Sequence, residues 1–173
     1  MDRLKQLNSA EEAQAVNLLS PMIERAPKIA ARVAKQRPFT DVHALNQAIR
    51  TELNSLSISE KIDLFLEHPE LAPRNPLSMT EASQDEQGRL DLTGSTNRYR
   101  QELYRLNAQY REKFGFPFII ALVRHDTMES VLSEFETRIR QTRDTEIAAA
   151  IEQVMAVSAS RVKRAFENTV TQS

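Results

Sequence analysis

Two short polar segments contain the residue types that acid–base chemistry requires. The first is the corner at His68, which stands directly before Pro69 at the point where a helical pattern ends. Proline cannot continue a helix and disfavours helical dihedrals in the residue before it. Histidine titrates close to neutral pH, and the chain has only three histidines and no cysteine. His68 is therefore the first candidate for proton transfer, although a histidine at a helix C-terminus can serve only to stabilise the helix dipole.

The second polar segment, residues 83–87, places Ser83, Glu86 and Gln87 at i, i+3 and i+4. On a helix this spacing brings a hydroxyl, a carboxylate and an amide to one face. Such a trio can bind a small polar ligand through several donors and acceptors. An exposed helical turn with local pairing is the alternative, and for the pattern alone it is the more common case.

Other classes of site find little support in the sequence. The lack of cysteine excludes thiolate nucleophiles and thiolate metal ligands, and it fits a reducing cytoplasm, which is the expected location. The three glycines form neither a phosphate-binding loop nor a nucleophile elbow. No second metal-ligating residue lies at helical ligand spacing around His68, so no metal site is predicted. A net charge of −1 gives no reason to expect a nucleic acid or a membrane as partner.

The elements that position these residues are predicted to be helices. Glycine is scarce and apolar residues recur at helical spacing, so the predicted fold class is all-α. We expect a single-domain helical bundle of about seven to nine helices over residues 1–173. A short helix is predicted over about 80–87, a long amphipathic helix over 95–114 that is capped by Gly115, and a final long helix from near Asp144.

Prolines and capping residues predict several further helix boundaries. Three prolines predict a loop over 69–79. The segment from Ser9 to Glu12 has the spacing of a capping box. A helix is predicted to begin at Pro21 and to continue along one apolar stripe until Arg37.

Residues 116–123 are the exception to the helical pattern. They have the β-branched and aromatic bias of a buried extended segment, but no second run exists with which they could form a sheet. We predict an extended stretch in the helical core, whose backbone N–H and C=O groups need other partners. Side chains or water are the common partners, and a polar ligand beside residues 119–122 is the alternative.

Three motifs, in the same order along the chain, closely resemble those of 2-oxo-4-hydroxy-4-carboxy-5-ureidoimidazoline (OHCU) decarboxylases. They are His68-Pro69-Glu70-Leu71-Ala72, the segment 81–87 and the segment 110–118. Matches at 37–39 and 143–146 extend the resemblance over essentially the whole chain. The family catalyses the last step in the conversion of urate to (S)-allantoin. The turn after Gln87 departs from the Gly-Ala-Gly-Leu that the family often has, since residues 88–91 are Gly-Arg-Leu-Asp.

The resemblance implies an all-α enzyme that needs no cofactor and no metal, with His68 as the catalytic acid/base and Glu86 assisting it. It implies a small-molecule substrate, OHCU, and suggests a homodimer. Substrate contacts are implied for Pro69, Ser83 and Gln87, for backbone groups of Phe118, Ile119, Ile120, Ala121 and Leu122, and for Arg161.

A non-catalytic helical interaction module is the alternative function, and a family member acting on another ureido or hydantoin acid is a third. The module predicts an exposed apolar groove. The enzyme instead predicts that His68, Ser83, Glu86 and Gln87 gather beside the backbone of residues 118–122.

Overall fold

The computed structural model describes residues 2–93 and 98–167, and these form nine α-helices and three short 3-10 helices without any β-strand. The predicted all-α fold class is therefore confirmed. None of the helices in these ranges is both long and apolar enough to cross a membrane. The α-helices are α1 (Arg3–Ser9), α2 (Glu12–Leu19), α3 (Pro27–Ala34), α4 (Val42–Asn54), α5 (Ile58–Leu66), α6 (Glu81–Gly88), α7 (Arg100–Phe114), α8 (Met128–Arg138) and α9 (Arg143–Phe166), and the 3-10 helices are η1 (Ser20–Met22), η2 (Pro76–Ser78) and η3 (Leu122–Arg124).

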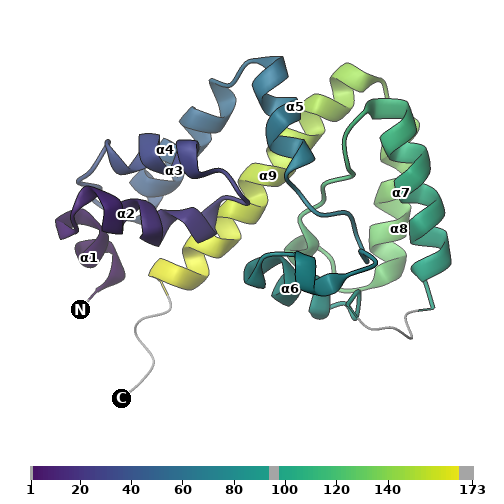
Figure 1. The fold of residues 1–173 in the computed structure, drawn as a ribbon, viewed down its shortest axis with the longest axis horizontal. Coiled ribbons are helices and arrows are strands. Elements are labelled where there is room, and N and C mark those ends of the chain that lie inside the picture. Colours follow the sequence, from purple (N-terminus) through teal and green to yellow (C-terminus); the bar gives the residue numbers. More distant parts are fainter. Residues whose placement is uncertain (1, 94–97, 168–173) are drawn as a thin grey trace. The chain divides into compact units, whose positions relative to one another are not determined.

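These elements pack as two compact units (Figure 1). The first unit comprises the described residues up to 57 and those from 155 onward, and so contains α1 to α4 and the second part of α9. The second unit, residues 58–154, contains α5 to α8 and the first part of α9. Every predicted site residue except Arg161 belongs to the second unit. A single functional domain over the whole chain stays a prediction.

In the first unit, α2 packs against α3 and α3 packs against α4. Two polar side chains tie the helix ends together. The amide of Asn8 both donates to and accepts from the backbone of Phe39, at 2.8 Å in each case. The guanidinium of Arg37 donates to three carbonyl oxygens at the ends of two helices, those of Leu7 and Ala10 at the end of α1 and that of Ala34 at the end of α3. The Arg37-Pro38-Phe39 motif thus closes helix ends, which is a structural role.

The predicted capping box at Ser9 is wrong. Ser9 is the last residue of α1, where its hydroxyl donates to the carbonyl oxygen of Lys5 at 3.0 Å. Helix α2 begins at Glu12 without a side-chain cap. The serine hydroxyl is therefore used by the preceding helix rather than by the following one.

The helix predicted to run on from Pro21 is also wrong. Pro21 belongs to η1, the chain is extended at Ile23, and α3 begins only at Pro27. Pro27 has no N–H to continue a helix and disfavours helical dihedrals at Ala26, which has ψ of 63°. The apolar periodicity therefore spanned two separate helices.

The second unit is built around Tyr110 on α7. Its ring lies 4.5–5.9 Å from the ring centroids of Phe114, Phe116, Phe118 and Phe135. The described part of the predicted 95–114 helix begins at Arg100, and residues 95–97 lie outside the described residues. The loop predicted over 69–79 contains only the short η2, and α6 follows it, capped by Thr80.

The extended segment is confirmed in kind but is shorter than predicted. Residues 116–121 are buried and have no helical assignment, and the chain then turns into η3 at Leu122. Val123, the last residue of the predicted segment, is 56% exposed. The segment therefore passes through the aromatic core and leaves it at η3.

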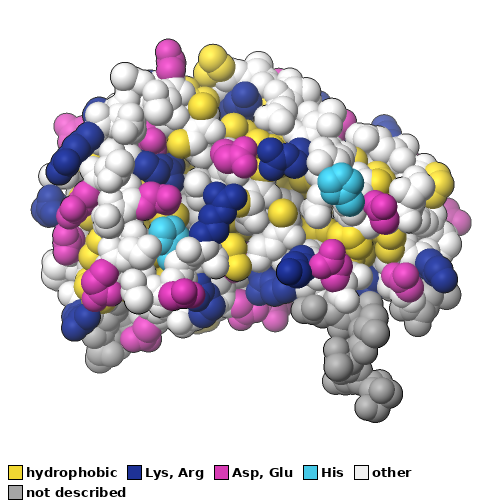
Figure 2. Space-filling model, turned by 180° about the vertical axis from the view of Figure 1, so that it is seen from behind, with side chains coloured by type: hydrophobic (Ala, Val, Ile, Leu, Met, Phe, Trp, Pro, Cys, Tyr) yellow, Lys and Arg dark blue, Asp and Glu magenta, His cyan; other side chains and the backbone are white. Residues whose placement is uncertain are grey.

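Charged side chains of both signs are interspersed over the face drawn in Figure 2. This mixture agrees with the near-zero net charge of the sequence.

Two glycine substitutions test the backbone of the second unit with opposite expected signs. Gly115 has φ of 82°, and a Cβ there would meet nothing within 4 Å, so G115A should destabilise only through backbone strain, by about 1 kcal/mol. Gly88 ends α6, and its Cβ would make an ordinary 3.7 Å contact with Thr93, so G88A should stabilise by about 0.5 kcal/mol. Urea unfolding of both variants measures the two effects, and equal signs would contradict the assigned backbone conformations.

Candidate active site

His68 is held at the end of α5 by two contacts with the preceding helical turn. Its backbone N–H donates to the carbonyl oxygen of Phe65 at 3.0 Å, and its ring Nδ1 lies 2.9 Å from the carbonyl oxygen of Leu64. A carbonyl oxygen only accepts, so Nδ1 bears the proton of this hydrogen bond. Nε2 is therefore the ring nitrogen that can exchange a proton with a reacting group.

The loop after His68 is clamped between two amide side chains. From α6, Gln87 accepts from the Ala72 N–H at 2.8 Å and donates to the Glu70 carbonyl at 2.9 Å. From α7, Asn107 donates to the Leu71 carbonyl at 2.9 Å. These bonds hold Ala72 at φ of 49°, in the left-handed region that non-glycine residues rarely adopt. Gln87 thus brings the last turn of α6 against the loop that His68 begins.

Helix α6 turns a polar face inward. Its only fully buried side chains are those of Ser83 and Gln87, and Glu86, one position before Gln87, is half-buried. Apolar packing therefore does not hold α6 in place, and hydrogen bonds such as those of Gln87 do so instead. Such a departure from the usual apolar inner face is expected at functional or strained sites.

Three side chains satisfy part of the extended segment's backbone. Arg138 donates to the Ile119 carbonyl at 2.6 Å, and Gln153 accepts from the Ala121 N–H at 2.8 Å. Arg89, directly after α6, donates to the Leu122 carbonyl. The Ala121 and Leu122 carbonyls also accept N–H groups of the η3 turn, at 3.0 Å each. Protein groups thus already occupy much of the segment's C-terminal half.

The middle of the extended segment differs from its C-terminal half in how its backbone groups are paired. Within residues 2–93 and 98–167, no group pairs with the N–H of Ile119 or with the N–H and C=O of Ile120, although both residues are buried. Buried backbone groups are rarely left without partners. The N–H donors of Ile119 and Ile120 and the C=O acceptor of Ile120 are therefore available to a ligand.

A buried charge network supports the arginine that holds this segment. Arg138 lies 3.0 Å from a carboxylate oxygen of Glu146, and the Tyr110 hydroxyl donates to the same oxygen at 2.6 Å. Burial, followed by the hydrogen bond to Glu146, raises the pKa of Tyr110 far above its ordinary value. Arg138 also lies over the ring of Phe118, 4.4 Å from its centroid. The guanidinium is thus paired, stacked and aimed at the Ile119 carbonyl.

Comparison with known proteins shows to which family this chain belongs. The model of the OHCU decarboxylase family matches residues 8–163. The chain belongs to the OHCU decarboxylase family. It is 34% identical to the OHCU decarboxylase of Mus musculus over 164 residues, covering 94% of this chain and 91% of the mouse protein.

An archaeal relative and a solved structure extend the likeness. The OHCU decarboxylase of Haloferax volcanii is 29% identical over 165 residues, covering 95% of this chain and 96% of the relative. A crystal structure of (S)-allantoin synthase superposes with a TM-score of 0.72 and 26% identity, covering 94% of this chain. This chain spans 53% of that synthase chain.

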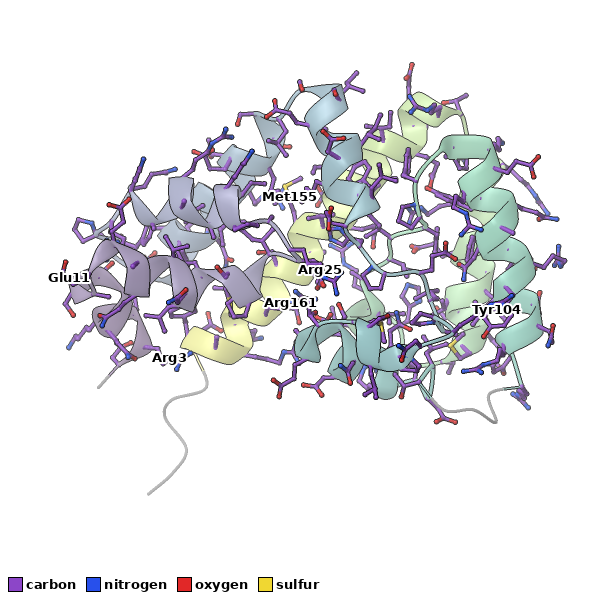
Figure 3. All side chains as sticks on the ribbon, viewed as in Figure 1. Arg3, Glu11, Arg25, Tyr104, Met155 and Arg161 are labelled. Carbon is purple, nitrogen blue, oxygen red and sulfur yellow. The ribbon has the colours of Figure 1, made fainter. Side chains whose placement is uncertain are left out.

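Most of the residues that the resemblance to OHCU decarboxylases selected lie in the second unit, on the loop, on α6 and on the extended segment. Arg161 lies in the first unit, on α9 (Figure 3), where it is buried and forms an ion pair with Glu24 at 2.9 Å. It also donates to the Pro21 carbonyl at 3.2 Å. Its substrate contact stays a prediction. No cluster of three metal-ligating side chains occurs among the described residues.

The sequence analysis missed four residues that position the candidate site: Arg89, Asn107, Arg138 and Gln153. A signal was available for two of them. Asn107 occupies an inner position of the α7 stripe, and Arg138 follows Val131 and Phe135 on the buried face of α8. A polar residue at a position where periodicity expects an apolar one indicates a buried polar contact.

The clamp predicts a large effect of replacing Gln87. Q87L leaves the Ala72 N–H and the Glu70 carbonyl without partners, and should lower the free energy of unfolding by about 2–4 kcal/mol. The matched control is Q84L on the same helix, which removes one bond, to the Met79 carbonyl, and should cost about 1 kcal/mol. Equal losses in urea unfolding would show that the loop does not depend on Gln87.

The charge network predicts that Arg138 cannot be replaced alone. R138M leaves the carboxylate of Glu146 buried without its cation and should cost about 3–5 kcal/mol. R140M, two positions away and exposed, should change stability by less than about 0.5 kcal/mol. The double variant R138M/E146L should lose less stability in thermal unfolding than the two single variants together, because neither charge is then buried without the other. Additive losses would contradict the pairing.

Proposed function

We propose that this protein decarboxylates OHCU to (S)-allantoin in urate degradation, with His68 as the catalytic acid/base. Membership of the OHCU decarboxylase family supports this enzyme over a non-catalytic interaction module. The observation that carries the proposal is the pair of hydrogen bonds from Gln87, which join the helix bearing Glu86 to the loop that begins at His68.

The reaction makes modest demands on the protein. The bond from the ring carbon to the carboxylate breaks and CO2 leaves. The electron pair delocalises into the adjacent ring imine–amide system, so the substrate supplies its own electron sink. One proton must then be added, from one face, to the neighbouring ring carbon that bears the ureido group. The carbon that lost CO2 becomes the carbonyl carbon of allantoin, and its hydroxyl proton passes to the ring nitrogen of the former imine. General acid–base catalysis and fixed hydrogen bonds are sufficient for these steps.

His68 suits the proton transfer because its orientation is fixed. The hydrogen bond from Nδ1 to the Leu64 carbonyl leaves Nε2 to exchange the proton. Since the ring is held against α5, Nε2 approaches a bound substrate from one direction, which accounts for a product of a single hand. Glu86 can hold the substrate or polarise the imidazole, and Pro69 keeps the chain from continuing the helix.

We assign substrate recognition to two sets of polar groups. The buried hydroxyl of Ser83 lies on the inward face of α6. The N–H of Ile119 and the N–H and C=O of Ile120, which have no partner among the described residues, are suited to the alternating N–H and C=O edges of a ureido ring. Ala121 and Leu122 contribute less than the family resemblance implies, because side chains already occupy several of their backbone groups. The main role of Gln87 is to hold the loop of residues 70–72.

Three further expectations accompany the proposed activity. Both units form one functional domain, which the family match over residues 8–163 supports. A homodimer and a cytoplasmic location stay predictions, which light scattering of the purified protein and cell fractionation would test.

His68→Asn tests the proposed mechanism. The variant keeps a polar side chain but cannot exchange a proton near neutral pH, so kcat should fall by about 10²–10⁴-fold. The unstable substrate is formed in place by urate oxidase and hydroxyisourate hydrolase, and circular dichroism follows the appearance of (S)-allantoin. With H68N the product should approach a racemate, because water then adds the proton to either face.

The matched control is His43→Asn, which changes an exposed histidine on α4. H43N should retain the wild-type rate and product hand. Production of (S)-allantoin by H68N at the wild-type rate would overturn the role of His68.

A further inference from the structure

A cavity of about 430 Å³ lies on the other flank of the loop clamp, and it contains none of the residues proposed to contact OHCU. One wall is the loop of residues 70–74. The opposite wall is one face of α7, formed by Tyr104, Asn107, Ala108 and Arg111 at i, i+3, i+4 and i+7. The volume is within the range of small-molecule sites.

The cavity is lined by an unusual set of side chains for a surface hollow. Arg74 lies over the ring of Tyr104, 5.5 Å from its centroid, and Tyr104 projects from α7 (Figure 3). Arg111 pairs with the carboxylate of Glu70 across the cavity. Two guanidinium groups and one carboxylate give the lining an excess of one positive charge, which suits a ligand with a single negative charge.

Asn107 provides a second, independent sign of a ligand. It is only 4% exposed, and its amide nitrogen is committed to the Leu71 carbonyl, which fixes the orientation of the amide. Its oxygen is buried and has no hydrogen-bond partner among the described residues. An unsatisfied buried acceptor is costly, so an N–H group supplied at this wall is favourable. The exposed side chains of Arg74 and Arg111 can shift to admit it.

We propose that this cavity is a second binding site, for a small planar monocarboxylate that also bears an amide-type N–H group. The carboxylate binds between Arg74 and Arg111. The guanidinium of Arg74 moves from the Tyr104 ring to the carboxylate, and the planar part takes its place on the ring. The N–H group donates to the oxygen of Asn107. Because the same loop is clamped by Gln87 on α6, the ligand adds to the forces that hold residues 70–72.

N-carbamoylglycine, the simplest ureido carboxylate, is the probe for this site. It is titrated into the full-length protein, and binding is followed by NMR at the Tyr104 ring, which lines this cavity and has no role in the candidate active site, and at the Asn107 side-chain amide. Saturable shifts of both signals are expected. Propionate lacks the N–H groups and N-methylurea lacks the carboxylate, so each should bind at least about tenfold more weakly.

The variants R74Q and R111Q should each weaken binding of N-carbamoylglycine by about tenfold, as expected when one charge-assisted contact is lost. R105Q is the matched control, because Arg105 is an exposed arginine on α7 that does not line the cavity, and it should bind as the wild type does. The absence of saturable shifts at Tyr104 and Asn107 would overturn the proposal. Equal affinities of R74Q, R111Q and R105Q would do so too.

Discussion

The clamp on residues 70–72 is the constraint on which the second unit depends. This loop has no sheet or helix to satisfy its backbone, and the amides of Gln87 and Asn107 take that role from opposite elements. The clamp fixes where the chain goes after His68, brings α6 to the loop, and keeps Ala72 in a left-handed conformation. Without it, α6 would have little to hold it, since the side chains that it fully buries are polar.

The extended segment is subject to the same requirement, that buried polar groups be hydrogen-bonded. An isolated extended stretch in a helical core must find partners for each N–H and C=O. Arg138, Gln153 and Arg89 provide several of them, and the network of Glu146 and Tyr110 makes a buried arginine tolerable. The N–H and C=O of Ile120 have no partner among the described residues, and these are the groups that we propose bind the substrate. The backbone groups that can bind a ligand are therefore those that the protein's own side chains do not hydrogen-bond.

Local rules predicted much of this fold because they act within a few residues. Pro69 ends the helix before His68, Gly115 takes the positive φ that ends α7, and the spacing of Ser83 and Gln87 places both on one buried face. The same rules failed where two elements compete for one residue. The hydroxyl of Ser9 can bond to either of two helices, and it bonds to the preceding one. The apolar periodicity after Pro21 continues across Pro27, although Pro27 begins a new helix.

By itself the sequence determined the all-α class, the corner at His68, the polar face of α6 and the resemblance to OHCU decarboxylases, because each depends on residue type and short spacing. Only the tertiary structure decided that Gln87 clamps a loop, that Arg138 holds the Ile119 carbonyl, and that the backbone groups of Ile120 find no partner among the described residues. The partners in the first two of these contacts stand 15 and 19 residues apart in the sequence. No local pattern encodes such a pairing, since it arises only when separate elements pack and each buried polar group must find a partner.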